Sequence, residues 1–367
     1  MKRILLAICT LALCTLTAGA QPAPSCPAPQ NDEVRNIILL IGDGMGLGQV
    51  AAYLIDQRYA PTSFDRAPYT AICKTYSANN RVTDSAASGT AMATGCKTNN
   101  GFIGMLGDST VVKNMTELAR EKGLATGLVV TSHLMDATPS AFAAHVPNRH
   151  MGREIAEMYV TSGIDVLAGG GLQYFLPQEQ DPRNLIEAMQ AQGYTYATTV
   201  DAFCAADKLP VIGLFADKYM PRAPKRGDYL ARATSHTLEL LSRQPNGFFV
   251  MIEGSQIDGA CHDNNTADML AEMADFDAAI NNAFDFADTH PGTLVIVVAD
   301  HETGGLTIVS NKKDFTASES GIDHKYSTTS HSGTPVVLYA YGAGASRFSG
   351  LMENTDIFRR MKELLID

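Results

Sequence analysis

The chain has 367 residues, of which 45% are hydrophobic and 18% are charged. This composition supplies a large core, so it excludes a disordered segment and a disulfide-stapled miniprotein. The 28 Lys and Arg residues against 39 Asp and Glu residues give a formal net charge of −11. That sign argues against a nucleic-acid binder, which needs basic residues to contact phosphates.

The first twenty residues have the pattern of a secretory signal peptide. Lys2 and Arg3 form its positive end, residues 4–16 are an apolar run, and Ala18-Gly19-Ala20 matches a cleavage site. The alternative is a membrane anchor, but the run is short for a hydrocarbon layer of about 30 Å. We therefore predict cleavage after residue 20 and a periplasmic or secreted protein. Loss of Lys2 and Arg3 would take the net charge from −11 to −13.

A Pro-rich, polar stretch over residues 21–32 is expected to be a tether ahead of the fold. The cysteines beyond the signal have neither CxxC nor zinc-finger spacing, and their number is odd. At least one is therefore unpaired or pairs between chains, and we expect most of them to be buried thiols. These cysteines, whose pairing the sequence leaves open, are Cys26, Cys73, Cys96, Cys204 and Cys261.

Short apolar runs alternate with helical stretches along the chain. Continuous Val/Ile/Leu runs are typical of strands buried on both faces, so we predict a three-layer α/β/α sandwich with a large, mostly parallel central sheet. The predicted strands are residues 36–41, 71–76, 126–130, 165–168, 248–252, 293–299 and 335–341. The predicted helices are residues 85–94, 115–121, 153–160, 184–191, 228–243 and 269–287.

No linker divides the part of the chain that follows the tether. Residues 33–367 are therefore expected to form a single catalytic domain. Hydrophobic patterning is weaker over residues 171–224, and this stretch is predicted to be a small peripheral insertion.

Polar clusters follow four of the predicted strands at their carboxyl ends. In open α/β sheets, sites form where strand ends and their loops meet. Acidic clusters that meet at one edge would repel each other unless a cation lay between them. The clusters are Gly42-Asp43-Gly44, Asp136-Ala137-Thr138, Glu253-Gly254 and Asp300-His301.

Two kinds of metal ligand occur around these clusters. Asp258 and His262 are four residues apart and share one helix face, so they could hold one ion. Asp300-His301 offers an oxygen and a nitrogen ligand on a turn, and such mixed sets favour zinc. His331 would lie at the same edge if the strand after it ran antiparallel to its neighbours.

An all-oxygen set favours magnesium instead, completed by waters. Asp43, Thr138 and Glu253 form such a set.

Ser85 is the candidate nucleophile, in the segment VTDSAASGT of residues 82–90. The small residues after it permit close packing, and a helix N-terminus favours an anion. Serine needs activation to attack at neutral pH, and a zinc ion on its oxygen would supply it. The alternative is that Ser85 is merely a helix N-cap.

The segment VTDSAASGTAMATG resembles the active-serine signature of the alkaline phosphatase family. Five further motifs agree with the family in kind, order and spacing, from Asn36 to about Val336, which is most of the mature chain. They are NIILLIGDGMG, MDATPSAFAAHVPNR, MIEGSQIDGACH, VADHETGG and SHSGTPV.

The resemblance implies hydrolysis of phosphate monoesters through a phosphoserine on Ser85, with Arg149 as the phosphate clamp. It also implies two Zn²⁺ ions and one Mg²⁺ ion as cofactors. Three divalent ions would outweigh the four carboxylates of the cluster and leave a positive pocket for a phosphate dianion. The implied ligands are Asp258, His262 and His331 for the first zinc, Asp300 and His301 for the second, Asp43 bridging the second zinc and the magnesium, and Thr138 and Glu253 for the magnesium.

The sequence departs from the family pattern beside Asp258. Gly259 stands where the enterobacterial pattern has a lysine, so we expect weaker retention of phosphate than in the lysine-bearing type. The chain is also shorter than many relatives, which leaves a homodimer open. For Asp136, a turn or N-cap role and a role near the magnesium are both open.

Two other functions remain as alternatives. One is a related phosphodiesterase or sulfatase of the same superfamily, against which Arg149 argues because a second ester group leaves less room for its fork. The other is a non-catalytic protein that binds metal or phosphate, which would have to explain an intact Ser85. No nucleic-acid partner and no membrane span after signal removal are expected.

Overall fold

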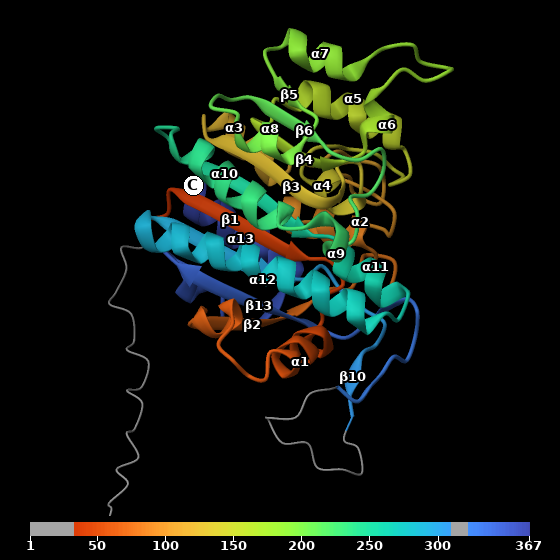
Figure 1. Ribbon diagram of the computed structural model, residues 1–367, viewed down its shortest axis with the longest axis vertical. Helices are drawn as coiled ribbons and strands as arrows, with labels where there is room; N and C mark the ends of the chain where they lie inside the picture. Colours follow the sequence, from red (N-terminus) through yellow and green to blue (C-terminus); the bar gives the residue numbers. More distant parts are fainter. Residues whose placement is uncertain (1–32, 310–321) are drawn as a thin grey trace, which may run out of the picture. The chain divides into compact units, whose positions relative to one another are not determined.

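A ten-stranded sheet runs through the described part of the chain, residues 33–309 and 322–367, in the computed structural model (Figure 1). The predicted signal peptide and tether lie outside the described residues. In spatial order the strands are β14 (Gly350–Glu353), β2 (Tyr69–Lys74), β13 (Val336–Gly342), β8 (Thr293–Val298), β1 (Asn36–Gly42), β7 (Phe248–Gly254), β3 (Ala125–His133), β4 (Val166–Gly170), β6 (Val211–Leu214) and β5 (Thr195–Ala197).

The strands of this sheet are parallel except for β13. That strand is antiparallel to both of its neighbours, β8 and β2. The other pairings, including those of β1 with β7 and β8, are parallel. The mostly parallel sheet predicted from the sequence is therefore confirmed.

Two short ladders lie outside the sheet. They pair β10 (Thr307–Ile308) with β11 (His324–Lys325), and β12 (His331–Ser332) with β9 (Glu302–Thr303).

The core lies along the central strands, where the hydrophobic runs of the sequence are buried on both faces. Residues 37–41 of β1 and all six residues of β8 are buried. Helices must therefore cover both faces of the sheet, because neither face has the alternation of a half-exposed strand.

Helices cover the two faces (Figure 1). On one face α12 packs against α10, α11 and α1, and on the other α2 packs against α4 and α13. The longer helices are α1 (Leu47–Asp56), α2 (Ser85–Thr94), α3 (Met115–Glu121), α5 (Gly152–Ser162), α7 (Leu185–Ala191), α10 (Tyr229–Ser242), α11 (Gln256–His262), α12 (Thr266–Thr289) and α13 (Asn354–Leu365). The shorter ones are α4 (Ala137–Ala141), α6 (Leu172–Phe175), α8 (Val200–Cys204), α9 (Ala223–Arg226) and the 3-10 turns η1 (Ser63–Arg66) and η2 (Ala345–Arg347).

Every predicted strand and helix is present, with differences at the ends. The helices predicted at residues 85–94 and 115–121 coincide with α2 and α3. The strand predicted at residues 71–76 is instead β2, which begins and ends two residues earlier. The short strands β5, β6 and β14 at the two edges of the sheet were not predicted.

The stretch predicted as a peripheral insertion, residues 171–224, contains α6, α7, β5, α8 and β6. Its strands form one edge of the sheet, and its last residues lead into α9. That this stretch is an insertion stays a prediction.

Among the described cysteines, Cys73 and Cys261 are buried free thiols, and Cys96 and Cys204 are partly exposed ones. Cys26 lies outside the described residues. In the same described part of the chain, no helix combines the length and the apolar character needed to cross a membrane.

Candidate active site

Four adjacent strands at the centre of the sheet, β8, β1, β7 and β3, bring the predicted site residues to one edge. Because these strands are parallel, their carboxyl ends meet there. Asp43 follows β1, and Asp300 and His301 follow β8. Thr138 lies on α4, after β3. Glu253 is the second-last residue of β7, and Asp258 and His262 lie on α11, which follows that strand.

His331 reaches the same edge because β13 is antiparallel. It lies in β12, just ahead of β13, so the chain enters the sheet from the site edge. The strand after His331 is therefore antiparallel to its neighbours, as the prediction for this residue required.

Ser85 is the first residue of α2 and is buried. Asp84 is the N-cap, and its carboxylate accepts a hydrogen bond from Ala87 N at 2.9 Å. The structure therefore rules out the alternative that Ser85 is the cap. The Ser85 Oγ lies 3.2 Å from Nε2 of His301, which leaves the hydroxyl at the metal-ligand cluster.

His262 and His331 both hold Nδ1 against a backbone carbonyl. The distances are 2.7 Å from His262 Nδ1 to Thr329 O and 2.9 Å from His331 Nδ1 to Thr83 O. A carbonyl only accepts, so Nδ1 carries the proton in each neutral ring. In its neutral form each ring therefore carries its lone pair on Nε2, as a metal ligand requires. Without a metal, the carboxylate of Asp258, with Oδ2 3.1 Å from Nε2 of His262, raises the pKa of that ring to about 9, so a metal at this position would displace a proton. Burial and the neighbouring His301 lower the pKa of His331 to about 4, which keeps this ring neutral.

His301 is oriented by a hydroxyl relay. Its Nδ1 lies 3.2 Å from Oγ1 of Thr303, and the Thr303 hydroxyl donates to Oδ1 of Asp258. Because that hydroxyl proton is used, Thr303 accepts the proton of His301 Nδ1. All three histidines thus present Nε2 to the site.

Within the described part of the chain, two groups of at least three His, Cys, Asp or Glu side chains have ligand atoms within 4.8 Å of one another. One is Asp258, His262 and His331, the set implied for the first zinc. The other is Asp43, Asp258 and His301, so Asp258 belongs to both groups. Asp300, implied as a ligand beside His301, has Oδ2 3.1 Å from the Nε2 of that ring.

The buried carboxylates of the site lack sufficient neutralising partners. Burial, followed by repulsion from Asp300 and Asp258, raises the pKa of Asp43 well above its usual value. Burial and repulsion from Asp136 raise the pKa of Glu253 in the same way. A bound divalent cation would relieve both effects, because it stabilises the charged forms.

Buried oxygen atoms without hydrogen-bond partners also indicate that the site needs a cation. Among the described residues, Asp43 Oδ1, Asp300 Oδ2 and Thr138 Oγ1 are buried without a hydrogen-bond partner. Glu253 lies close by, with its Oε2 accepting from Ser255 Oγ at 2.7 Å. Oxygen donors in this state fit Mg²⁺ or Zn²⁺, so the residues present suit the metals that the family resemblance implies.

Arg149 lies between two carboxylates. Its Nη1 is 3.3 Å from Oδ2 of Asp84 and its Nη2 is 3.2 Å from Oδ1 of Asp136. Asp84 is held in turn by Gly101 N, which donates to the same oxygen at 2.9 Å. Asp136 is the N-cap of α4 and accepts from Ala137 N at 2.8 Å. The open question about Asp136 is thus answered in part: it caps a helix and orients the guanidinium of Arg149.

A pocket of about 500 Å³ contains Ser85, Arg149, Asp43 and Asp258 in its lining. Two of its lining residues, Tyr219 and Arg222, were not singled out from the sequence. They come from the connection between β6 and α9, within the stretch predicted to be peripheral. The only sequence signal was local: residues 218–226 include four basic side chains and no acidic one, in an acidic chain.

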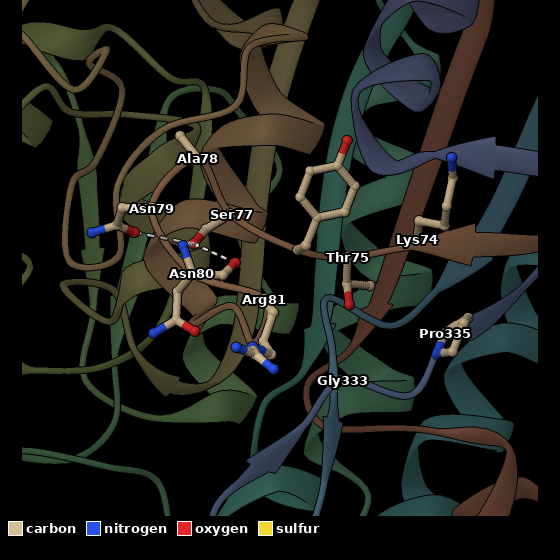
Figure 2. A pocket seen from close by; sticks show the side chains of 10 residues that line it. Lys74, Thr75, Ser77, Ala78, Asn79, Asn80, Arg81, Gly333 and Pro335 are labelled. Carbon is tan, nitrogen blue, oxygen red and sulfur yellow. Dashed lines mark hydrogen bonds between the residues drawn. The ribbon is translucent and has the colours of Figure 1, made fainter.

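A second hollow, of about 590 Å³, lies along the segment that leads from β2 towards α2 (Figure 2). Residues 74–81 line it together with Gly333 and Pro335. A turn braces the segment: Asn80 N donates to Ser77 Oγ at 3.1 Å, and Ser77 Oγ donates to Asn79 Oδ1 at 3.2 Å (Figure 2). Its lining includes none of the predicted site residues.

Comparison with known proteins agrees with this geometry. Residues 34–325 match the family model described as alkaline phosphatase. The chain is 34% identical to alkaline phosphatase 4 of Bacillus subtilis, over 90% of this chain and 89% of that protein. It is 33% identical to the alkaline phosphatase of Escherichia coli K12, over 90% of this chain and 86% of that protein.

Solved structures give the same result. The alkaline phosphatase from the Antarctic bacterium TAB5 superposes with a TM-score of 0.84 at 37% identity, and the match covers 91% of this chain and 98% of that one. A buried serine, an arginine and a metal-ligand cluster in one pocket are what such an enzyme needs. The chain therefore belongs to the alkaline phosphatase family, the phosphoric monoester hydrolases.

Proposed function

We propose that this enzyme cleaves phosphate monoesters through a covalent phosphoserine on Ser85, with two zinc ions and one magnesium ion as cofactors. The observation that carries the proposal is the position of the Ser85 hydroxyl, 3.2 Å from Nε2 of His301 and in the same pocket as Arg149. A nucleophile, an anion-binding fork and a metal-ligand cluster are the three parts that phosphoryl transfer requires.

The site residues have the donor chemistry for these ions. The first zinc would be held by Asp258, His262 and His331, the second by Asp300 and His301, and the magnesium by Thr138 and Glu253, with Asp43 between the last two sites. When bound, such ions lower the pKa of a coordinated hydroxyl or water and stabilise negative charge on phosphate oxygens. A solved structure of a mutant of the TAB5 enzyme is described with Mg bound, which supports a magnesium site in this family.

The residues of the chain then perform two displacements. Ser85 Oγ gives up its proton to solvent and attacks phosphorus, the bond from phosphorus to the ester oxygen breaks, and the alcohol leaves with a proton taken from solvent. Water next attacks the phosphoserine and loses a proton to solvent, the bond from phosphorus to Ser85 Oγ breaks, and inorganic phosphate leaves while Ser85 Oγ regains a proton. Arg149 would hold two phosphate oxygens through both steps, because its planar fork suits bidentate contact.

The direct test is to trap the intermediate. Purified enzyme, supplied with Zn²⁺ and Mg²⁺, is mixed with 4-nitrophenyl phosphate and quenched in acid, and the peptide that contains Ser85 is examined by mass spectrometry. We expect a mass increase of one phosphoryl group on Ser85. Phosphate release by wild type with no modified serine at any quench time would contradict the covalent mechanism.

A substrate panel separates this proposal from its alternatives. Bis(4-nitrophenyl) phosphate and 4-nitrophenyl sulfate are compared with the phosphate monoester under the same conditions. We expect the monoester to react fastest. Faster cleavage of the diester or of the sulfate would favour the related phosphodiesterase or sulfatase activity, and no turnover despite bound metal would favour a binding protein.

We also propose that the chain is exported and then acts as one catalytic domain, residues 33–367. N-terminal sequencing of the mature protein is expected to begin at Gln21, after the Ala18-Gly19-Ala20 motif. We propose in addition that the mature protein forms a homodimer. Its molar mass in solution, measured by light scattering, tests this separately.

A further inference from the structure

Arg222 lies in the wall of the active-site pocket, close to Gly259 of α11. A Cβ atom built on Gly259 would lie 3.2 Å from Nη2 of Arg222, so the guanidinium occupies the space that a side chain at this position would need. Gly259 directly follows Asp258, which belongs to both metal-ligand groups. The pocket therefore has a second guanidinium beside the proposed metal centre, in addition to Arg149.

The backbone on both sides of Arg222 is fixed. Before it, Gln256 Nε2 donates to Met220 O at 2.6 Å and to Pro221 O at 3.1 Å, which ties the connection to the start of α11. After it, the buried guanidinium of Arg226 pairs with Asp275 at 2.7 Å on α12. A cation whose backbone is anchored in this way loses little freedom when it binds a ligand.

The guanidinium itself has donors to spare. Nη1 donates to Gln256 O at 3.2 Å, and Nη2 donates to Asp263 Oδ2 at 3.0 Å. These two bonds use two of the five N–H groups of an arginine. The Asp263 side chain is 66% exposed, so this ion pair lies at the surface and contributes little stability that would oppose a new contact.

Exposure places Arg222 at the rim of the pocket and Ser85 at its floor. Ser85 is 3% exposed, whereas the side chain of Arg222 is 28% exposed and its neighbour His262 is 37% exposed. A phosphoryl group attacked by Ser85 must lie at the floor. The leaving group then extends towards the rim, past Asp258 and His262, where Arg222 lies.

We infer that Arg222 forms a subsite for an anionic group on the leaving-group side of the substrate, such as a carboxylate or a second phosphate. This rests on the proposed function and adds a substrate class to it. The chain as a whole carries a net charge of −11, so a cation at the rim of the pocket would favour such substrates where the surrounding surface repels them. Arg222 is thus a specificity-determining residue, whereas Arg149 serves the phosphoryl group itself.

The test compares phenyl phosphate with 4-carboxyphenyl phosphate in wild type, Arg222→Gln, Arg222→Lys and Lys225→Gln. Lys225 is an exposed residue of α9 outside the pocket lining, so its variant matches the change in net charge. For Arg222→Gln we expect KM for the carboxylated ester to rise about tenfold, as for loss of one charge-assisted contact, with kcat nearly unchanged. KM for phenyl phosphate should stay within about twofold, and Arg222→Lys should recover part of the loss.

Equal losses on both esters, or an equal effect of Lys225→Gln, would overturn the inference. A separate measurement does not depend on turnover: calorimetric binding of pyrophosphate and of phosphate to the metal-loaded Ser85→Ala variant, with and without Arg222→Gln. Arg222→Gln should weaken the binding of pyrophosphate more than that of phosphate. If wild type hydrolyses neither ester, the proposed function fails, and the binding comparison still decides whether Arg222 forms the subsite.

Discussion

The hydroxyl of Ser85 and Nε2 of His301 are 3.2 Å apart, although 216 residues separate them in the chain. The contact joins the start of α2 to the loop after β8, and it is fixed from both sides. Asp84 caps α2, and Thr303 holds the other nitrogen of His301. The proposed nucleophile is therefore positioned before any substrate arrives, which is an arrangement that lowers the cost of reaching a transition state.

Replacing Ser85 tests the nucleophile directly. We expect Ser85→Ala to lower kcat by at least about a thousandfold, because the change removes the hydroxyl that would form the covalent intermediate. Metal content, measured by elemental analysis, should be unchanged, since the metal-ligand groups do not include Ser85. Ser349→Ala, at an exposed serine outside the pocket, is the matched control. Activity that survives Ser85→Ala would contradict the assignment.

Asp258 is shared by two candidate metal groups, and His262 belongs to one of them. We therefore expect Asp258→Asn to reduce zinc from about two ions per chain to below one, and His262→Gln to remove about one. Elemental analysis of protein dialysed at fixed free zinc measures both. Equal zinc content in the two variants would show that Asp258 does not bridge the groups.

Chelation tests the contribution of the metals to stability. Removing bound ions leaves Asp43 and Glu253 buried with strongly raised pKa values and without neutralising charge. We expect the melting temperature to fall after treatment with EDTA and to recover when Zn²⁺ and Mg²⁺ are restored, because a ligand that binds only the folded state stabilises it. A melting temperature unaffected by EDTA, with metal loss verified, would contradict this.

Asp84 has two separable roles. It caps α2 through Ala87 N and pairs with Arg149. Asp84→Asn keeps an oxygen for the cap but removes the charge, so we expect a higher KM with little change in stability. Asp84→Ala also removes the cap and should lower the free energy of unfolding by about 1 kcal/mol. Urea denaturation and steady-state kinetics distinguish the two. Identical stability of both variants would show that the cap contributes nothing.

The ion pair of His145 and Glu117 predicts a pH effect on stability away from the metal site. Burial opposes the charge on His145, but Glu117, with its Oε1 3.1 Å from Nε2, and the carbonyl of Gly104 raise the net pKa of this imidazole above its usual value. A raised histidine pKa stabilises the fold below the unfolded-state value of about 6.5, and this stability is lost as the pH rises through the folded-state pKa.

We therefore expect the free energy of unfolding of wild type to fall by up to about 1 kcal/mol more than that of His145→Gln between about pH 6 and pH 9. The difference is small because Glu117 is partly exposed. Urea denaturation of the EDTA-treated proteins measures this without interference from bound metal. Parallel pH profiles for the two proteins would contradict the prediction.

Gly259 offers a further test. A lysine there was expected to strengthen phosphate retention, but its side chain would meet Nη2 of Arg222. For Gly259→Lys we now expect a lower phosphate inhibition constant together with loss of the preference for anionic leaving groups. Gly259→Ala, which adds only a methyl group, is the control and should have a smaller effect on both. An unchanged inhibition constant in Gly259→Lys would reject the expectation about phosphate.

Much of the fold could be predicted because its signals are local. The predicted bounds of α2 and α3 coincide with the structure, where Asp84 and Asn114 are the N-caps just ahead of these helices. The bounds of β2 were not predicted correctly, since the register of this strand is set by its pairing with β13 and β14 rather than by its own hydrophobicity. The strands β5, β6 and β14, which lie at or next to the edges of the sheet, are too short for a periodic signal.

The candidate site, like the fold, could be predicted from the sequence only in part. Ser85 and the metal-ligand candidates lie in motifs at strand ends, where residue type and spacing carry the information. Tyr219 and Arg222 lie on a connection that Gln256 holds by binding the backbone of Met220 and Pro221. The basic residues of this connection are visible in the sequence, but a long-range hydrogen bond has no periodic or compositional signature, so only the structure could show where the connection lies.

The antiparallel β13 makes the proposed metal site depend on segments that lie far apart in the chain. His331 and the strand after it follow the other candidate ligands, from Asp43 to His301, and are therefore synthesised after them. A truncated product that ends before His331 would lack both the third ligand of the Asp258–His262 group and the strand between β8 and β2. Tight binding at the proposed zinc site would therefore distinguish molecules that include β13 from such fragments, and an interrupted product would be left with an open sheet edge prone to aggregation.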